Sequence, residues 1–227
     1  MEHVLRLLST LALKGAMNRL AGDYQVAAKL RIDADFAPTI GLLKRLRGGE
    51  PADVVILTQE GLDELATEGA VAAVSKVDLA RSYVGIAVKA GSGHPDIATE
   101  PALRKTLLAS RSVAYSQIGA SGIFFADLIK RLGIAAEINA QATITSGFTA
   151  ERLITGEADL AVQQISELKQ VAGIEIVGPI PYELQTPAVF SAGRMAASKQ
   201  PAQADAFLSY LASKDVAPVL RESGLEP

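Results

Sequence analysis

Short apolar runs alternate along this chain with longer segments in which apolar residues recur every three or four positions. The short runs predict β-strands, and the longer segments predict amphipathic helices. Strands are predicted at residues 4–8, 30–36, 53–57, 84–88, 112–115, 142–145, 160–162 and 174–177, and helices at residues 14–21, 39–47, 60–67, 101–109, 123–132, 149–154 and 202–212. This alternation is typical of an α/β protein with mostly parallel sheets flanked by helices. Glycines suited to the C′ position follow several helices: Gly22, Gly48, Gly69, Gly133 and Gly156.

One short segment occurs twice. Residues 49–56 read Gly-Glu-Pro-Ala-Asp-Val-Val-Ile and residues 156–162 read Gly-Glu-Ala-Asp-Leu-Ala-Val, and each connects an amphipathic helix to an apolar strand. Chance is one explanation, because such a turn suits any helix-to-strand connection. The other is a chain of two lobes of similar build, which we expect at residues 1–80 plus 185–227 and at residues 81–184.

The composition excludes several classes of function. Hydrophobic residues make up 49% of the chain and charged residues 21%, and the formal net charge of −3 favours no nucleic-acid partner. The chain has no cysteine, which excludes disulfides, thiolate nucleophiles and cysteine-ligated zinc. Its two histidines are His3, before the first strand, and His94, in a Gly-Ser-Gly-His-Pro turn that is expected to be an exposed loop. We expect neither to be a base, and we expect no metal and no cofactor.

We expect no export signal in the first residues, since the apolar stretch at residues 4–8 is interrupted by Arg6 and is too short for a signal-peptide core or a membrane span. The expectation is a cytoplasmic protein as the chain stands, or a periplasmic one if this is a trimmed mature form. No direct insertion into a membrane is expected, and a monomer is the default.

Small hydroxyl and amide side chains follow almost every predicted strand. In open parallel sheets a ligand binds outside the carboxyl ends of the strands. Hydroxyls, amides and the free N–H groups of helix starts can hold an anion without a full counter-charge. The predicted ligand-binding residues at these ends are Ser9, Thr10, Pro38, Thr39, Thr58, Ser146, Gln163 and Gln164.

The most distinctive of these connections is the loop at residues 116–122, Ser-Gln-Ile-Gly-Ala-Ser-Gly. Its small residues Gly119, Ala120, Ser121 and Gly122 allow backbone N–H groups to approach an oxyanion. An alternative is a tight connection in which Ser121 caps the helix. The Walker pattern and the dinucleotide fingerprint are both missing.

Two basic residues are candidates for contact with an anion. Lys14 stands in the first turn of a predicted helix, where a cation is unfavourable to the helix dipole unless an anion compensates. Arg152 lies within a short predicted helix and can point either to the ligand or to the surface. The alternative for both is a solvated surface position, and Glu151 and Glu167 are expected at the surface too.

Four segments resemble the molybdate-binding group of the type 2 periplasmic binding proteins: residues 8–17, 36–39, 49–54 and 156–159. The resemblance covers essentially the whole chain. It implies two lobes joined by two crossover strands, with an oxyanion buried between them and held by hydroxyls and backbone amides. It also implies the role of a solute-binding protein that feeds an ABC-transporter permease.

The chain departs from that group at the positions expected to contact the ligand. Ala12 stands where the first loop usually has a serine, Pro38-Thr39 where a serine pair is usual, and Gln164 where a tyrosine is usual. Amides, a lysine and a threonine suit a small organic carboxylate better than a tetrahedral oxyanion such as molybdate. Residues 162–168 and 177–181 also resemble a subgroup related to aconitate isomerase, whose members are enzymes on a binding-protein scaffold.

Three functions follow as hypotheses. The first is a non-catalytic receptor for one small anion, held in the cleft between the lobes. The second is an isomerase that moves a proton along an unsaturated tricarboxylate, with the amine of Lys14 as its base if the pKa of that amine is lowered. The third, an effector domain of a transcription factor, ranks last because the chain contains no helix-turn-helix segment.

Overall fold

The structure, a computed structural model, describes residues 4–227, so His3 lies outside the described residues. The chain divides into two compact units. Unit 1 comprises Met1–Ser82 and Ala188–Pro227, and unit 2 comprises Tyr83–Pro187. The chain therefore passes from unit 1 into unit 2 and later returns.

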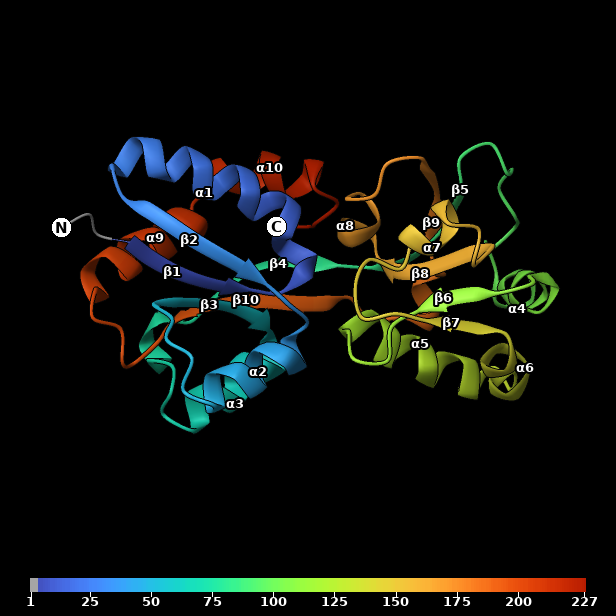
Figure 1. Ribbon diagram of the computed structural model, residues 1–227, viewed down its shortest axis with the longest axis horizontal. Coiled ribbons are helices and arrows are strands. Elements are labelled where there is room, and N and C mark those ends of the chain that lie inside the picture. The colour runs from blue at the N-terminus through green and yellow to red at the C-terminus, as the bar shows by residue number, and fades with distance from the viewer. Residues whose placement is uncertain (1–3) are drawn as a thin grey trace. The chain divides into compact units, whose positions relative to one another are not determined.

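Unit 1 is built on a five-stranded sheet in the order β2-β1-β3-β10-β4 (Figure 1). β1, β2 and β3 are parallel, and β10 is antiparallel to both of its neighbours. One face of the sheet packs against α1, α9 and α10, and the other face packs against α2 and α3. The elements are β1 (Val4–Ser9), η1 (Leu11–Leu13), α1 (Lys14–Ala28), β2 (Arg31–Phe36), α2 (Thr39–Arg47), β3 (Val54–Thr58), α3 (Gln59–Thr67), η2 (Ala73–Ser75), β4 (Val77–Ser82), β10 (Ala188–Arg194), α9 (Pro201–Leu211), η4 (Lys214–Val216) and α10 (Ala217–Glu222).

Unit 2 has a five-stranded sheet in the order β7-β6-β8-β5-β9, in which only β5 runs against the others. α4, α5 and α6 cover one face, and α7 and α8 cover the other. The elements are β5 (Val84–Lys89), α4 (Glu100–Ala109), β6 (Val113–Tyr115), α5 (Ala120–Arg131), α6 (Ala135–Ala140), β7 (Ala142–Ile144), α7 (Glu151–Ile154), β8 (Leu160–Gln164), α8 (Ile165–Leu168), β9 (Ile174–Pro179) and η3 (Tyr182–Leu184).

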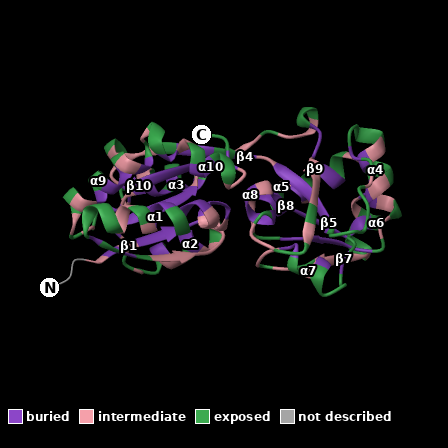
Figure 2. Ribbon diagram, turned by 90° about the horizontal axis from the view of Figure 1, so that it is seen from above, coloured by how far each residue is buried: buried purple, intermediate pink, exposed green. Residues whose placement is uncertain are grey.

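The buried residues of each unit lie mainly in the strands and on the inner sides of the helices (Figure 2). This follows from the sequence pattern, because the short apolar runs become strands that are covered on both faces. The predicted α/β fold with mostly parallel sheets flanked by helices is confirmed, since all strands but one run in the same direction in each sheet.

The recurring segment reflects a shared build of the two units. β3 and β8 are both the central strand of their sheets, with a parallel neighbour on one side and an antiparallel neighbour on the other. The aspartate before each strand fastens it to that parallel neighbour. Asp53 Oδ2 accepts the N–H of Arg6 at 2.9 Å, and Asp159 Oδ2 accepts the N–H of Arg111 at 2.9 Å. The repeated aspartate therefore has a structural role in both units.

Several predicted boundaries were wrong. Gly22 is not a helix end, because α1 continues to Ala28 and the left-handed residue after it is Lys29. Gly49 rather than Gly48 has the positive φ after α2. β4, β10, α6, α8 and α10 were not predicted. β4 and β10 pair with each other although about a hundred residues separate them, so no local pattern marks that pairing.

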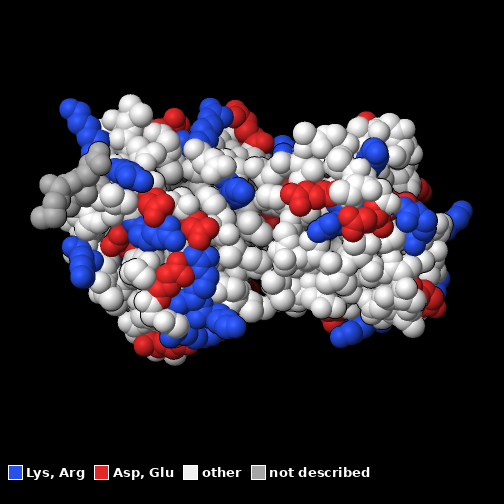
Figure 3. Space-filling view, in the orientation of Figure 1, with Lys and Arg blue, Asp and Glu red and all other residues white. Residues whose placement is uncertain are grey.

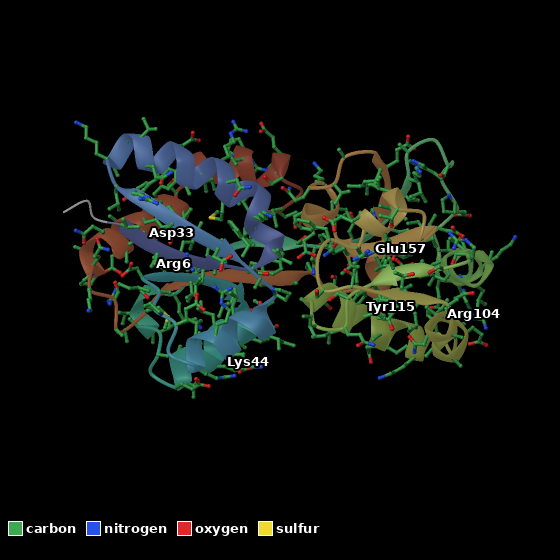
Figure 4. The ribbon with its side chains drawn as sticks, in the orientation of Figure 1. Arg6, Asp33, Lys44, Arg104, Tyr115 and Glu157 are labelled. Carbon is green, nitrogen blue, oxygen red and sulfur yellow. The ribbon has the colours of Figure 1, made fainter. Side chains whose placement is uncertain are left out.

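Several charged side chains of unit 1 form a mixed cluster over β1, β2 and α2 (Figure 3). Arg6 and Arg45 bridge three carboxylates, and Figure 4 shows Arg6 beside Asp33. Hydrogen bonds from Arg45 lower the pKa of Asp35 and of Glu50. Because three carboxylates surround the two arginines, this cluster does not form an anion-attracting surface.

Candidate functional site

The carboxyl ends of β1, β2 and β3 lie side by side in unit 1. The strand register pairs Ser9 with Phe36 on one side and with Ile56 on the other. Beyond the strands, the N–H of Thr10 donates to the carbonyl of Ile56 at 2.9 Å, and the N–H of Ala37 donates to the carbonyl of Ser9 at 3.2 Å. The segments predicted to bind a ligand are thus brought together at one edge of this sheet.

The hydroxyl groups at this edge are held by local hydrogen bonds. Ser9 is fully buried, and its Oγ donates to the carbonyl of Thr10 at 3.2 Å. Thr39 Oγ1 accepts the N–H of Thr58 at 3.1 Å, and Thr58 Oγ1 accepts the N–H of Gly61 at 3.4 Å, which caps α3. The start of α2 and the end of β3 are therefore fixed to each other.

The other predicted residues of unit 1 differ in the groups that are available to a ligand. The side chain of Ala12 is buried in the hydrophobic core, so only its backbone can contact a ligand. Pro38 is the N-cap residue of α2. Lys14 is the first residue of α1, and its Nζ lies 5.9 Å from the centroid of the Phe36 ring, at the end of β2. The lysine therefore reaches the same edge of the sheet.

In unit 2, Ser116 organises the loop at residues 116–122. Its Oγ accepts the N–H of Ile118 at 3.3 Å and the N–H of Gly119 at 3.0 Å. Gly119 is the N-cap of α5, and no side chain caps this helix, so the alternative in which Ser121 is the cap is wrong. The N–H groups of Ala120 and Ser121 are in the first turn, where a helix provides no acceptor. They are backbone donors of the predicted kind.

The strand before this loop is firmly held. Tyr115, labelled in Figure 4, donates from its hydroxyl to Asn139 Oδ1 at 2.6 Å and packs edge-on against Phe125 at 5.2 Å between ring centroids. Its carbonyl accepts the N–H of Thr145 at 3.2 Å, which ties β6 to the loop that follows β7. The starts of both loops are therefore held by these contacts of Tyr115.

The remaining predicted residues of unit 2 lie at the ends of β7 and β8. Ser146 is exposed, whereas Gln163 and Gln164 are buried. The amide oxygen of Gln163 accepts the N–H and the hydroxyl of Thr149 at 2.8 and 3.1 Å, and its amide nitrogen donates to the carbonyl of Gly147 at 3.1 Å. Gln163 is thus engaged by the loop at residues 145–149.

Glu167 is the residue that sequence reasoning missed. It was expected at the surface, but the structure buries it in α8, where its carboxylate accepts hydrogen bonds from the side chain of Gln163 and the backbone N–H of Gln164. Gln164 is the N-cap of α8, and a glutamate three residues after an N-cap often bonds back to the cap N–H. That spacing was the available signal. Burial raises the pKa of Glu167 to about 8.

This pKa gives a prediction for the dependence of stability on pH. Between the ordinary value of 4.5 and about 8, the folded protein holds a proton on Glu167 that the unfolded chain releases. The free energy of unfolding of the parent therefore contains a contribution that falls as the pH rises through this window, with a slope of up to about 1.4 kcal/mol per pH unit. Glu167→Gln removes this contribution, so the free energy of unfolding of the variant should rise relative to that of the parent from pH 5 to pH 9. Urea unfolding followed by circular dichroism measures this, and parallel curves for the two proteins would contradict it.

Other charged candidates lie elsewhere. Arg152 pairs with Glu157, which Figure 4 labels, at 3.0 Å. His94 is in a loop as predicted and pairs with Glu175 at 3.0 Å. Among residues 4–227, no three or more side chains of the metal-binding types come together. Within the same residues, no helix is long and apolar enough to cross a membrane.

Both units thus present hydroxyls, amides and backbone N–H groups at the carboxyl ends of parallel strands, on the architecture of the type 2 periplasmic binding proteins. The chain belongs to the family of bacterial extracellular solute-binding proteins, whose sequence pattern matches residues 5–226. This confirms the resemblance seen in the sequence.

The chain is similar in sequence or in structure to several individual proteins. The chain is 37% identical to an aconitate isomerase from a Pseudomonas species over 98% of this chain and 87% of that protein. It is similar in structure to the periplasmic molybdate-binding protein of Azotobacter vinelandii, with a TM-score of 0.84 and 18% identity over 98% of this chain and 99% of the other. The sulfate-binding protein SubI of Mycobacterium tuberculosis H37Rv gives a TM-score of 0.78 and 14% identity over 99% and 87%.

Proposed function

We propose that this protein binds a small organic carboxylate through the strand-end groups of both units, which act on the same ligand molecule. The observation that carries the proposal is the chemistry of these ends. Hydroxyls, amides and helix-start N–H groups stand there, together with the cation of Lys14, and such donors suit an anion.

Carboxylate is favoured over a tetrahedral oxyanion by the residues that replace the usual hydroxyls. The side chain of Ala12 is buried in the core and offers no hydroxyl, and an amide at Gln164 replaces a tyrosine. The ammonium group of Lys14 is a point charge that pairs well with a carboxylate. In this role the loaded protein would deliver its ligand to a permease of the ABC-transporter type.

A thermal-shift screen tests the proposal. The purified protein is heated with molybdate, tungstate, sulfate, citrate, cis-aconitate or trans-aconitate, because a ligand that binds only the folded state raises the melting temperature. We expect shifts with one or more of the carboxylates and none with the inorganic anions. A shift with molybdate or tungstate alone would contradict the choice of carboxylate.

The second candidate function is isomerisation of an unsaturated tricarboxylate. Its support is the 37% identity with an aconitate isomerase across nearly the whole chain. In such a reaction a base takes a proton from the methylene carbon, the double bond shifts by one position, and a proton is returned to the former vinyl carbon. Lys14 is the candidate base of the sequence analysis.

Proton NMR of cis- and trans-aconitate with the protein distinguishes the receptor from the enzyme. Interconversion of the two isomers supports the isomerase, and binding without interconversion supports the receptor. If turnover is seen, Lys14→Met should abolish it while ligand binding persists at reduced affinity. Lys44→Met, a basic residue of α2 with an exposed side chain, is the matched control and should leave both unchanged. Full activity of Lys14→Met would remove this residue from the mechanism.

A further inference from the structure

The amide of Gln163 makes its hydrogen bonds to other groups of the protein. Gln163 is 3% exposed. Its oxygen accepts two hydrogen bonds from Thr149, and its nitrogen donates to the carbonyl of Gly147 and to the carboxylate of Glu167. A primary amide has two donor hydrogens and two acceptor lone pairs, so no hydrogen-bonding capacity is left for a ligand.

The backbone groups of Thr149 and Gly147 determine the orientation of this amide. The backbone N–H of Thr149 is a donor and needs the amide oxygen, whereas the carbonyl of Gly147 is an acceptor and needs the amide nitrogen. A flipped amide would place donor against donor and acceptor against acceptor in a buried position, which is costly. Glu167 is in turn held by the backbone N–H of Gln164.

These contacts end on the loop at residues 145–149. Gly147 and Thr149 are both in that loop, and Gly147 also donates its N–H to Thr145 Oγ1 at 3.3 Å. The loop connects β7 to α7 and carries Ser146, which is exposed. The conformation of this loop therefore depends on two side chains from β8 and α8.

We infer that Gln163 and Glu167 are positioning residues, which hold the loop at residues 145–149 in the shape that binds the carboxylate and do not touch the ligand themselves. This inference rests on the proposed function and reassigns Gln163 from a ligand contact to a support. It also gives Glu167, which is buried in α8, a role in binding through its contact with Gln163 and not through contact with the ligand.

Two apolar variants of similar length test the inference. Gln163→Met and Glu167→Met remove the hydrogen bonds and largely keep the volume. Amide hydrogen exchange of residues 145–150, measured without ligand, should become at least about tenfold faster in both variants, because the loop loses its anchor. Their affinity for trans-aconitate, measured by calorimetry, should fall at least about tenfold.

Two further variants separate positioning from general stability. Glu167→Gln keeps an oxygen that accepts from Gln163 and should restore both exchange and affinity to within about threefold of the parent. Gln170→Met is the matched control, since the amide of Gln170 donates to the carbonyl of Ser166 and not to the loop. It should leave both quantities unchanged.

Parent-like exchange and parent-like affinity in folded Gln163→Met and Glu167→Met would overturn the inference. If either variant does not fold, Thr149→Val takes its place, because it replaces the hydroxyl that contacts Gln163 by a methyl group. It should speed amide exchange of the same loop, and unchanged exchange would contradict the inference. If the parent does not bind trans-aconitate, the proposed function fails for this ligand, while the exchange experiment still decides whether the two residues hold the loop.

Discussion

Gly122→Ala should prevent unit 2 from folding normally. A Cβ atom at this position would lie 1.5 Å from the carbonyl oxygen of Ser116 and 2.4 Å from its carbonyl carbon. These are backbone atoms and cannot rotate away, so either α5 or the loop at residues 116–122 must move. We expect a loss of more than about 4 kcal/mol in the free energy of unfolding, together with loss of ligand binding. Thermal unfolding followed by circular dichroism measures the first effect, and the thermal-shift screen measures the second.

Gly147→Ala is the matched control for this prediction. Gly147 is also in a strand-end loop of unit 2, but a Cβ added there meets no atom within 4 Å. Its melting temperature should stay within a few degrees of the parent value. A Gly122→Ala protein that melts like Gly147→Ala would show that the start of α5 does not need this close approach.

Asp53→Ala should destabilise the protein more than Asp159→Ala, although the two aspartates occupy equivalent positions. Asp53 is 8% exposed and also accepts a hydrogen bond from Ser198 Oγ at 2.6 Å. Its removal leaves the N–H of Arg6 without its carboxylate partner in a covered position, for which we expect a loss of about 3 kcal/mol. The side chain of Asp159 is 43% exposed, so water can replace it, and we expect about 1 kcal/mol.

Urea unfolding at pH 7 measures both losses. Asp53→Asn is the control, because its amide oxygen still accepts the N–H of Arg6 and the loss should be smaller than for alanine. Equal losses for Asp53→Ala and Asp159→Ala would mean that burial does not decide the strength of these two contacts.

The sequence predicted most of the elements because periodicity is a local property. α2 was predicted with the exact bounds Thr39–Arg47, since its apolar positions recur at helical spacing between a proline and two glycines. The segments Gly-Glu-Pro-Ala-Asp and Gly-Glu-Ala-Asp correctly indicated two units of similar build. β4 and β10 were not predicted because charged or small residues interrupt their apolar runs, and because they pair with each other across a long stretch of the chain.

The sequence by itself determined the α/β class, the two similar halves and the hydroxyl and amide chemistry at the strand ends. Only the tertiary structure decided what each of these groups contacts. Gln163 follows a predicted strand in the same way as the other candidate residues, yet its amide makes hydrogen bonds to the loop at residues 145–149. Glu167 has a surface-type side chain that becomes buried when α8 packs on β5, β8 and β9. The physical reason is that burial and hydrogen-bond partners depend on segments distant in the chain, which no local pattern records.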